Sequence, residues 1–212
     1  MSPQMFGIIR LIALLLIAVS TGCTAGNSPA VDDSIRFVDD LTTNTTVEDD
    51  ISGLVFTDKQ GQQIALRDYL GKKPLVLVIT RGYSGSICPY CATQTSRLIA
   101  NYEKFRERNA EVIVVYPLEK PADQPNLDLF VAKAVSSLPA GEQQVPFPLL
   151  LDIELKAVDK LGIRRSLSKP ATYIFDKEGK VQFAYVGNSL SDRPSVKAML
   201  DQLDRLNKAS GG

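Results

Sequence analysis

Two cysteines stand three positions apart in the stretch SICPYC, where Cys88 and Cys91 flank a proline and a tyrosine. The chain has one further cysteine, Cys23, and no histidine. The lack of histidine excludes a Ser-His-Asp triad, a Cys-His pair and any imidazole ligand to a metal. Two thiols at this spacing supply a nucleophile and a second thiol that attacks the mixed disulfide. That sequence of steps is thiol-disulfide exchange.

Three other interpretations of the cysteine pair compete with redox chemistry. A zinc half-site requires two more soft ligands, and the chain has none to supply. A c-type haem requires histidine directly after the second cysteine, where this chain has Ala92. A static structural disulfide between Cys88 and Cys91 closes so small a ring that it stabilises little. The sequence therefore favours a redox-active dithiol, with no metal and no bound cofactor.

The composition is that of a globular protein with one domain and short attachments. Of 212 residues, 44% are hydrophobic and 23% are charged, which is typical of soluble domains. The formal net charge is zero, so the chain has no basic field that would attract nucleic acid.

The first 22 residues are typical of a bacterial lipoprotein signal peptide. Arg10 precedes a nine-residue apolar run from Leu11 to Val19, which is too short to span a bilayer. The run ends in STGC, which predicts cleavage before Cys23 and acylation of its sulfur. The alternative is an ordinary secretory peptide cut nearby, with Cys23 incidental. The lipoprotein reading places the protein in the bacterial cell envelope, anchored to the bilayer and facing outside the cytoplasm, where disulfides persist.

Residues 23–50 are predicted to form an acidic, flexible tether. The segment holds seven acidic residues and a single base, Arg36, and this like charge favours an extended, solvated chain. Its apolar stretch IRFV, residues 35–38, is the part able to dock on the domain. The folded domain then covers residues 51–212.

Strands and helices alternate along this domain. Continuous apolar runs at residues 74–80, 111–117 and 147–152 predict buried strands. Helical spacing predicts a helix of about 20 residues after the cysteines. It also predicts a helix over residues 126–138 and a short helix within residues 153–163 that ends at Gly162. A hairpin around Gly179 and a closing helix lined by Val196 and Leu206 complete the chain. This order predicts an α/β fold, a mixed central sheet with helices on both faces.

The cysteine pair falls at the start of the first long helix. Pro89 suits the first helical position, which makes Cys88 the residue at the helix end. The first-turn N–H groups and the helix dipole favour an anion there, so a lowered pKa is predicted for Cys88. Cys88 is therefore predicted as the nucleophile, and Cys91, one turn along, as the resolving thiol. Tyr90, between them, is predicted to tune the helix entrance.

With these features the chain resembles the thioredoxin superfamily, and within it the peroxiredoxin-like AhpC/TSA (redoxin) branch. The matching stretches are LVLVITRGYSGSICPYC and KPATYIFDKEGKVQFAYVG, and the resemblance covers about residues 51–207. It implies a thioredoxin-like fold in which Pro170 is a cis proline that faces the nucleophilic cysteine and shapes the substrate groove. It also implies electrons from a partner thiol. On the residues alone, Pro170 also fits an ordinary proline at a strand entrance.

The chain departs from the peroxiredoxin pattern at two positions. Typical peroxiredoxins carry proline seven residues, and threonine three residues, before the reactive cysteine; here these positions are Arg81 and Gly85. Ser84 and Ser86 flank the threonine position and are candidates to replace its hydroxyl, or simply turn residues. Peroxiredoxins also use an arginine near the final strands to polarise peroxide. The candidates for this role are Arg164 and Arg165, for which surface solvation is the alternative.

Three functions follow from these observations. The first is thiol-disulfide exchange in the cell envelope, with a protein thiol or disulfide as partner and the bilayer held through Cys23. The second is a thiol-dependent peroxidase in which Cys88 attacks peroxide. The third is a redox-inert envelope lipoprotein without enzymatic activity.

Overall fold

The computed structural model describes residues 35–47 and 51–210. The predicted signal peptide, residues 1–22, and the predicted lipidation site Cys23 lie outside the described residues. Within the two described ranges, no helix combines the length and apolar character needed to cross a bilayer.

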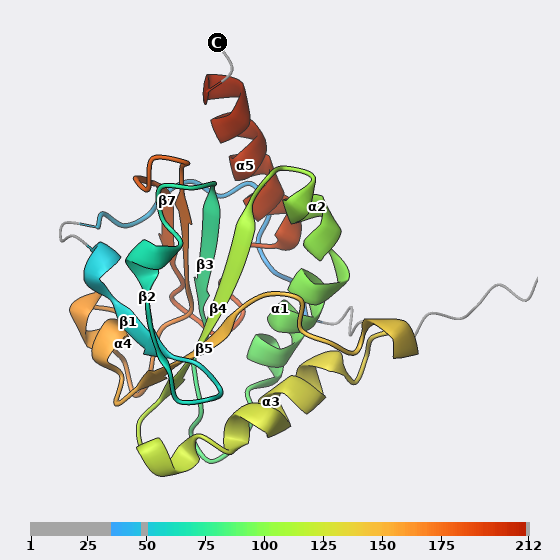
Figure 1. Cartoon of the computed structure of the whole chain (residues 1–212). Coiled ribbons are helices and arrows are strands. Elements are labelled where there is room, and N and C mark those ends of the chain that lie inside the picture. Colours follow the sequence, from blue (N-terminus) through green and yellow to red (C-terminus); the bar gives the residue numbers. More distant parts are fainter. Residues whose placement is uncertain (1–34, 48–50, 211–212) are drawn as a thin grey trace, which may run out of the picture.

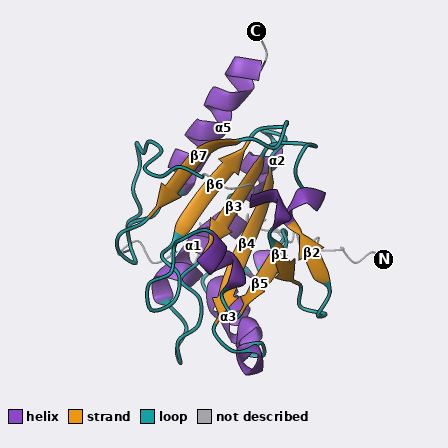
Figure 2. Cartoon of the chain, turned by 90° about the vertical axis from the view of Figure 1, so that its left-hand side faces the viewer, coloured by secondary structure: helices purple, strands orange, loops and turns teal. Residues whose placement is uncertain are grey.

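A seven-stranded mixed sheet forms the centre of the domain, with strand order β2-β1-β5-β4-β3-β6-β7. Figure 2 shows β7 at one edge of this twisted sheet and β2 at the other. The central strand β3 runs parallel to β4 and antiparallel to β6. The strands are β1 (Val55–Thr57), β2 (Gln63–Ala65), β3 (Leu75–Ile79), β4 (Glu111–Leu118), β5 (Leu149–Ile153), β6 (Ala171–Phe175) and β7 (Val181–Val186).

Helices cover both faces of this sheet, as predicted (Figure 1). Helix α4 packs on one face, and α1, α2 and α5 pack on the other. The domain therefore has the predicted α/β architecture. The helices are α1 (Pro89–Ala100), α2 (Tyr102–Arg106), α3 (Asn126–Val135), α4 (Lys156–Lys160) and α5 (Val196–Ser210).

Strand β3 shows why its sequence is apolar at every position. Its five residues are all buried. Leu77 points into the core on the α4 side, whereas Val76 and Val78 point into the core on the α1 and α5 side. Successive side chains of a strand point to opposite faces, so a strand covered on both faces requires an unbroken apolar run. This strand ends at the loop that carries the cysteine pair.

Three helices are shorter than the spacing predicts. One is α4, which covers only Lys156–Lys160 of the predicted residues 153–163, because β5 extends to Ile153 and the next two residues have positive φ. The predicted 20-residue helix is broken at Asn101, where α1 ends and α2 begins. The Asn101 side-chain amide donates to the carbonyl of Arg97, so the side chain supplies the bond that a continuing helix would have made. Helix α3 ends at Val135, three residues before the predicted end, although Leu138 is still buried.

Residues 35–47 form a docked segment, here called the strap. The sequence predicts an extended, solvated tether over residues 23–50, and this part of the prediction is wrong for the described residues. Val38 pairs with the backbone on both sides of Pro194, and Asn44 bonds to the backbone of β7. The Phe37 ring lies 5.0 Å from the guanidinium carbon of Arg97. The strap therefore docks through backbone hydrogen bonds and the Phe37 ring, while its acidic residues Asp39 and Asp40 stay exposed.

Candidate active site

The loop between β3 and α1 places both cysteines at one end of the sheet. Cys88 is the N-cap of α1, with an extended backbone, and Pro89 opens the helix as predicted. Both cysteines are free thiols. Both cysteines are buried, but Cys91 is fully buried whereas Cys88 retains 4% of its surface, so Cys88 is the less enclosed residue of the pair. The predicted positions of the two cysteines are thus confirmed.

Gly82 allows this loop to pass close to β4. Its φ of +90° lies in the left-handed region, and a Cβ at this position would lie 2.2 Å from the carbonyl oxygen of Pro117. Only glycine fits there without moving backbone. The next residue, Tyr83, donates its N–H to the same carbonyl at 3.1 Å. Gly82 is therefore required by the close approach of two backbones.

Arg81 connects the sulfur of Cys91 to the loop that precedes β6. Its backbone N–H donates to Sγ of Cys91 at 3.4 Å, and its carbonyl accepts from the N–H of Ser168 at 3.2 Å. These bonds hold the segment that carries Pro170 against the C-terminal end of β3. The sequence marks Arg81 as a departure from the usual proline, and in the structure its backbone N–H, which a proline would lack, contacts the sulfur.

A buried arginine that the sequence analysis does not identify also lies on Cys91. Both terminal nitrogens of Arg193 lie 3.8 Å from Sγ of Cys91, and one donates to Oε1 of Gln94 at 2.8 Å. Nε of Arg193 donates to the carbonyl of Leu190 at 2.8 Å. Arg193 retains only 1% of its surface.

A buried cation is costly unless an anion accompanies it. Among the described residues, no carboxylate forms an ion pair with Arg193. The group beside it that can become an anion is the thiol of Cys91. The geometry therefore identifies the Cys91 thiolate as the counter-ion of Arg193.

The pKa values of the two thiols follow this arrangement. Burial by itself raises the pKa of Cys91, but the hydrogen bond from Cys88, the charge of Arg193 and the N–H of Arg81 together lower it to about 6. The pKa of Cys88 is raised, chiefly by its hydrogen bond to Cys91, and further by burial and by the negative charge on Cys91. The predicted lowering at Cys88 is therefore wrong. One negative charge is shared by two adjacent sulfurs, and the donors favour Cys91.

Pro170 lies at the start of β6, buried, with its ring against Gly187 at the end of β7. No described peptide bond is cis, so the peptide before Pro170 is trans, which differs from the cis proline that the resemblance implies. Pro170 lines a cavity together with Arg81, and its predicted part in a substrate groove stays a prediction.

The remaining predicted residues lie around the pair without contacting the sulfurs through a hydrogen bond. The exposed Ser84 accepts from the Arg81 guanidinium at 2.7 Å, and Ser86 is exposed beside it. Tyr90 is half-buried and packs on the cluster that contains both cysteines. Arg164 forms an ion pair with Asp159. The arginine whose side chain reaches a sulfur is Arg193, whereas the side chains of Arg81, Arg164 and Arg165 form no hydrogen bond to either sulfur.

Tyr116 on β4 is a second buried polar residue near the pair. Its ring stacks on Phe130 of α3 at a centroid distance of 4.2 Å, within the cluster that holds Cys88 and Cys91. Its hydroxyl is buried without a hydrogen-bond partner among the described residues. Burial, followed by the charges of the two cysteines, raises the pKa of this hydroxyl, which keeps it neutral. A tyrosine inside an otherwise aliphatic strand, EVIVVYP, was the signal in the sequence.

The order of strands, the dithiol at the start of α1 and the β6–β7 hairpin define a thioredoxin-like domain. The model of the AhpC/TSA family matches residues 47–184, and the chain belongs to this family.

The curated relatives include both peroxide-named and disulfide-named proteins. The chain is 30% identical over 132 residues to "Peroxiredoxin Q, chloroplastic" of Gentiana triflora, covering 60% of this chain and 53% of that one. It is 24% identical over 127 residues to "Thiol-disulfide oxidoreductase ResA" of Bacillus thuringiensis subsp. konkukian, covering 60% of this chain and 62% of that one. The chain thus spans little more than half the length of the relatives it matches. Both names denote thiol oxidoreductases.

Solved structures show the same fold. Peroxiredoxin 6 of Arenicola marina, a variant form, matches with a TM-score of 0.63 at 16% identity, covering 78% of this chain and 75% of the other. A secreted disulfide oxidoreductase of Mycobacterium tuberculosis matches with a TM-score of 0.53 at 16% identity, covering 74% and 99%. Identities this low establish the fold alone.

Proposed function

We propose that the protein is a thiol-disulfide oxidoreductase whose CPYC dithiol exchanges with a protein thiol or disulfide. The observation that supports this function is the asymmetry of the pair. Cys88 is the residue of the pair that retains some exposed surface, and Cys91 is fully buried with a sulfur that accepts from Arg81 and Arg193. A resolving thiol acts only as its thiolate. The pKa of about 6 at Cys91 supplies that thiolate at neutral pH.

The proposed reaction begins with a proton shift inside the pair. Cys88 passes its proton to the Cys91 thiolate through their shared hydrogen bond, and the Cys88 thiolate attacks one sulfur of the partner disulfide. The partner's other sulfur leaves as a thiolate. Cys91, which then returns its proton to solvent or to the leaving thiolate, attacks Cys88 and releases the second partner thiol. The protein ends as a Cys88–Cys91 disulfide, and the partner gains two electrons and two protons, of which the pair supplies one and solvent the other.

A thiol-dependent peroxidase in the same fold is the second candidate. The relatives named peroxiredoxin Q favour it, and a buried guanidinium beside a sulfur is the kind of group that stabilises charge on a leaving oxygen. Arg193 contacts Cys91, however, whereas peroxide arriving from solvent meets Cys88. This geometry favours disulfide exchange over peroxide reduction.

A redox-inert lipoprotein is the third candidate, and the buried Arg193 makes it less favoured than a redox-active protein. A charge buried against a thiol destabilises the fold unless that thiol ionises.

We propose a location in the bacterial cell envelope, with residues 1–22 as signal peptide and acylated Cys23 as anchor. The apolar run before Cys23 supports this location.

Trapping of mixed disulfides tests the proposed exchange. In Cys91→Ser the resolving step is absent, so a partner disulfide should remain attached at Cys88 and appear as a reducible adduct on a non-reducing gel. Cys88→Ser is the matched control and should trap nothing, because Cys91 is buried. Equal trapping by both variants, or by neither, would contradict the assignment of roles.

A further inference from the structure

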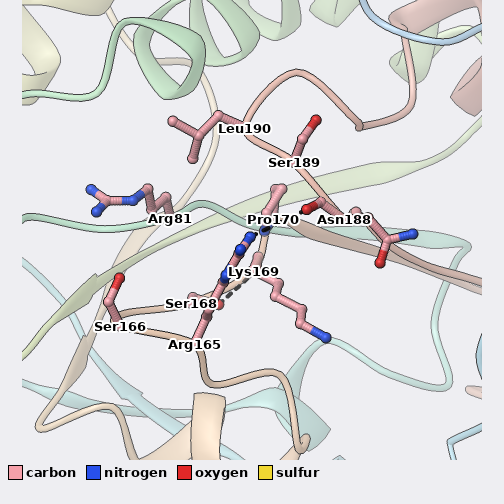
Figure 3. A pocket seen from close by; sticks show the side chains of 10 residues that line it. Arg81, Arg165, Ser166, Ser168, Lys169, Pro170, Asn188, Ser189 and Leu190 are labelled. Atoms are coloured by element: carbon pink, nitrogen blue, oxygen red, sulfur yellow. Dashed lines mark hydrogen bonds between the residues drawn. The ribbon is translucent and has the colours of Figure 1, made fainter.

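A cationic pocket of about 220 Å³ lies beside the redox pair. We give this name to the cavity formed by the end of β3, the loop before β6 and the loop after β7. Figure 3 shows Arg81, Arg165 and Lys169 around Pro170, with Leu190 on the far wall. Hydroxyl and amide groups of the two loops complete the lining.

The charge of this pocket is unbalanced. Its lining includes three cationic side chains and no carboxylate. Arg81 donates to the hydroxyl of Ser84, and Arg165 donates to the carbonyl of Asn188 at 3.3 Å, so both bonds go to uncharged oxygens. Among the described residues, none of the three cations forms an ion pair. A concave site with uncompensated positive charge attracts an anion.

On both walls of the cationic pocket, hydrogen bonds connect a lining residue to the sulfur of Cys91. On one wall, Arg81 donates its backbone N–H to Sγ of Cys91. On the other wall, Leu190 accepts at its carbonyl from Arg193, whose guanidinium lies on the same sulfur. Two of the residues that line the pocket, Arg81 and Leu190, are therefore connected by hydrogen bonds to the sulfur that forms the disulfide with Cys88 in the proposed reaction.

The lining distinguishes a protein segment from a small anion. Leu190 is 39% exposed on the pocket wall, which adds an apolar contact to the three cations. A polypeptide carries an acidic side chain and an apolar side chain a few ångströms apart and presents both at once. Hydrogen peroxide is small and uncharged, so it gains nothing from this lining.

We propose that the cationic pocket binds an acidic segment of the protein whose disulfide or thiol reacts with the pair, and so selects acidic partners. The proposal rests on the proposed function in thiol-disulfide exchange. It adds the substrate class, a cystine with acidic neighbours in a polypeptide. Arg165 and Lys169 bind the carboxylates, and Leu190 contacts an apolar neighbour.

Stopped-flow oxidation of the reduced protein by matched peptides tests this selection. Three disulfide-linked peptide dimers of equal length carry two aspartates, two serines or two lysines after the cysteine. We expect the aspartate dimer to react fastest and the lysine dimer slowest, with differences of about two- to five-fold per contacted cation. Added salt should reduce the advantage of the aspartate dimer, because exposed charges are screened.

The aspartate-to-serine rate ratio should fall in Arg165→Gln and Lys169→Gln, and should invert in Arg165→Glu. Arg205→Gln makes the same charge change on the exposed surface of α5 and is the matched control, whose ratio should equal that of the wild type. Ratios near one in the wild type, or the same fall in the control, would overturn the pocket proposal. The uncharged bis(2-hydroxyethyl) disulfide separates the two hypotheses: if neither it nor any dimer oxidises the wild type, the proposed function fails instead.

Discussion

The guanidinium of Arg193 lies 3.8 Å from Sγ of Cys91, although 102 residues separate them in the chain. Arg193 is buried, and Cys91 is the one group beside it that can balance its charge among the described contacts. This pairing makes Cys91, the proposed resolving cysteine, a more acidic thiol than Cys88.

Removal of the Arg193 charge should raise the pKa of Cys91. In Arg193→Gln the thiolate loses a counter-ion within hydrogen-bonding reach, and we expect the apparent pKa to rise from about 6 by about one to three units. Titration of the thiolate by its ultraviolet absorbance measures this change. Arg193→Lys should restore part of the shift, since the charge remains. An unchanged titration in a folded Arg193→Gln protein would rule out the counter-ion role.

The stability of the reduced protein should rise with pH between about 6 and 9. The folded pKa of Cys91 is lowered from its ordinary 9.0 to about 6, so its contribution is complete above pH 9 and is lost as pH falls through 6. The slope is at most about 1.4 kcal/mol per pH unit. The raised pKa of Cys88 has the opposite sign and lowers stability above pH 9. Urea unfolding at several pH values measures both limbs.

The oxidised protein is the control for this pH dependence, because neither sulfur titrates in a disulfide. It should lack the rise between pH 6 and 9. The same slope in oxidised and reduced protein would assign the effect to other groups.

The Cys88–Cys91 couple should be more oxidising than thioredoxin, whose potential is about −270 mV. Arg193 stabilises the thiolate of the reduced form and has no counter-ion once the disulfide forms. Arg193→Gln should therefore lower the potential at pH 7 by about 30 mV, which corresponds to a tenfold change in the two-electron equilibrium. Below pH 6 the difference should vanish, because Cys91 is then protonated in both proteins. Equilibration against glutathione buffers measures the potential; equal values at pH 7 would contradict the prediction.

Reaction of the reduced protein with hydrogen peroxide should be slow. The position of the usual threonine is Gly85, an exposed residue with φ of +84°, so a hydroxyl donor near the sulfur is missing. Loss of one such donor costs about 10² to 10³ in rate. Stopped-flow comparison of peroxide with a peptide disulfide checks this expectation. Peroxide reacting faster than the disulfide would favour the peroxidase, and Ser84→Ala and Ser86→Ala would then identify the replacement hydroxyl.

The anchor makes a separate prediction. Mature protein from membrane fractions should begin at Cys23 and carry acyl chains, which mass spectrometry detects. Cys23→Ser should release the domain from the membrane without altering its exchange rate in solution. An unmodified N-terminus at another residue would exclude the lipoprotein.

Local features of the sequence predict much of this site. Strand β3 is buried on both faces, so an unbroken apolar run identifies it. Proline is tolerated in the first turn of a helix but not in its interior, so Pro89 places Cys88 at the N-terminal end of the helix. The turn at Gly179 identifies the β6–β7 hairpin. Each of these features is set by neighbours in the chain.

Features that depend on distant segments escape such reasoning. Arg193 stands in the stretch SDRPSV, which has the pattern of a helix start, and nothing nearby indicates that its charge is buried against Cys91. For the same reason the sequence predicts the lower pKa for Cys88, whereas in the structure Cys91 has the lower pKa. The break at Asn101 reflects competition between one side chain and the helix backbone. The strap has an acidic composition, yet its Phe37 ring lies against the guanidinium groups of Arg97 and Arg193, which come from distant parts of the chain.

The docked strap also limits how far the domain can stand from a membrane. On the proposed anchor at Cys23, only residues 23–34 lie between the lipid and the first docked residue, Ile35, whose carbonyl accepts from Arg97. A fully extended chain covers at most about 3.6 Å per residue, which gives a reach of about 43 Å. The redox pair therefore samples a thin layer above the bilayer, and its partners are proteins that present their cystines at that height.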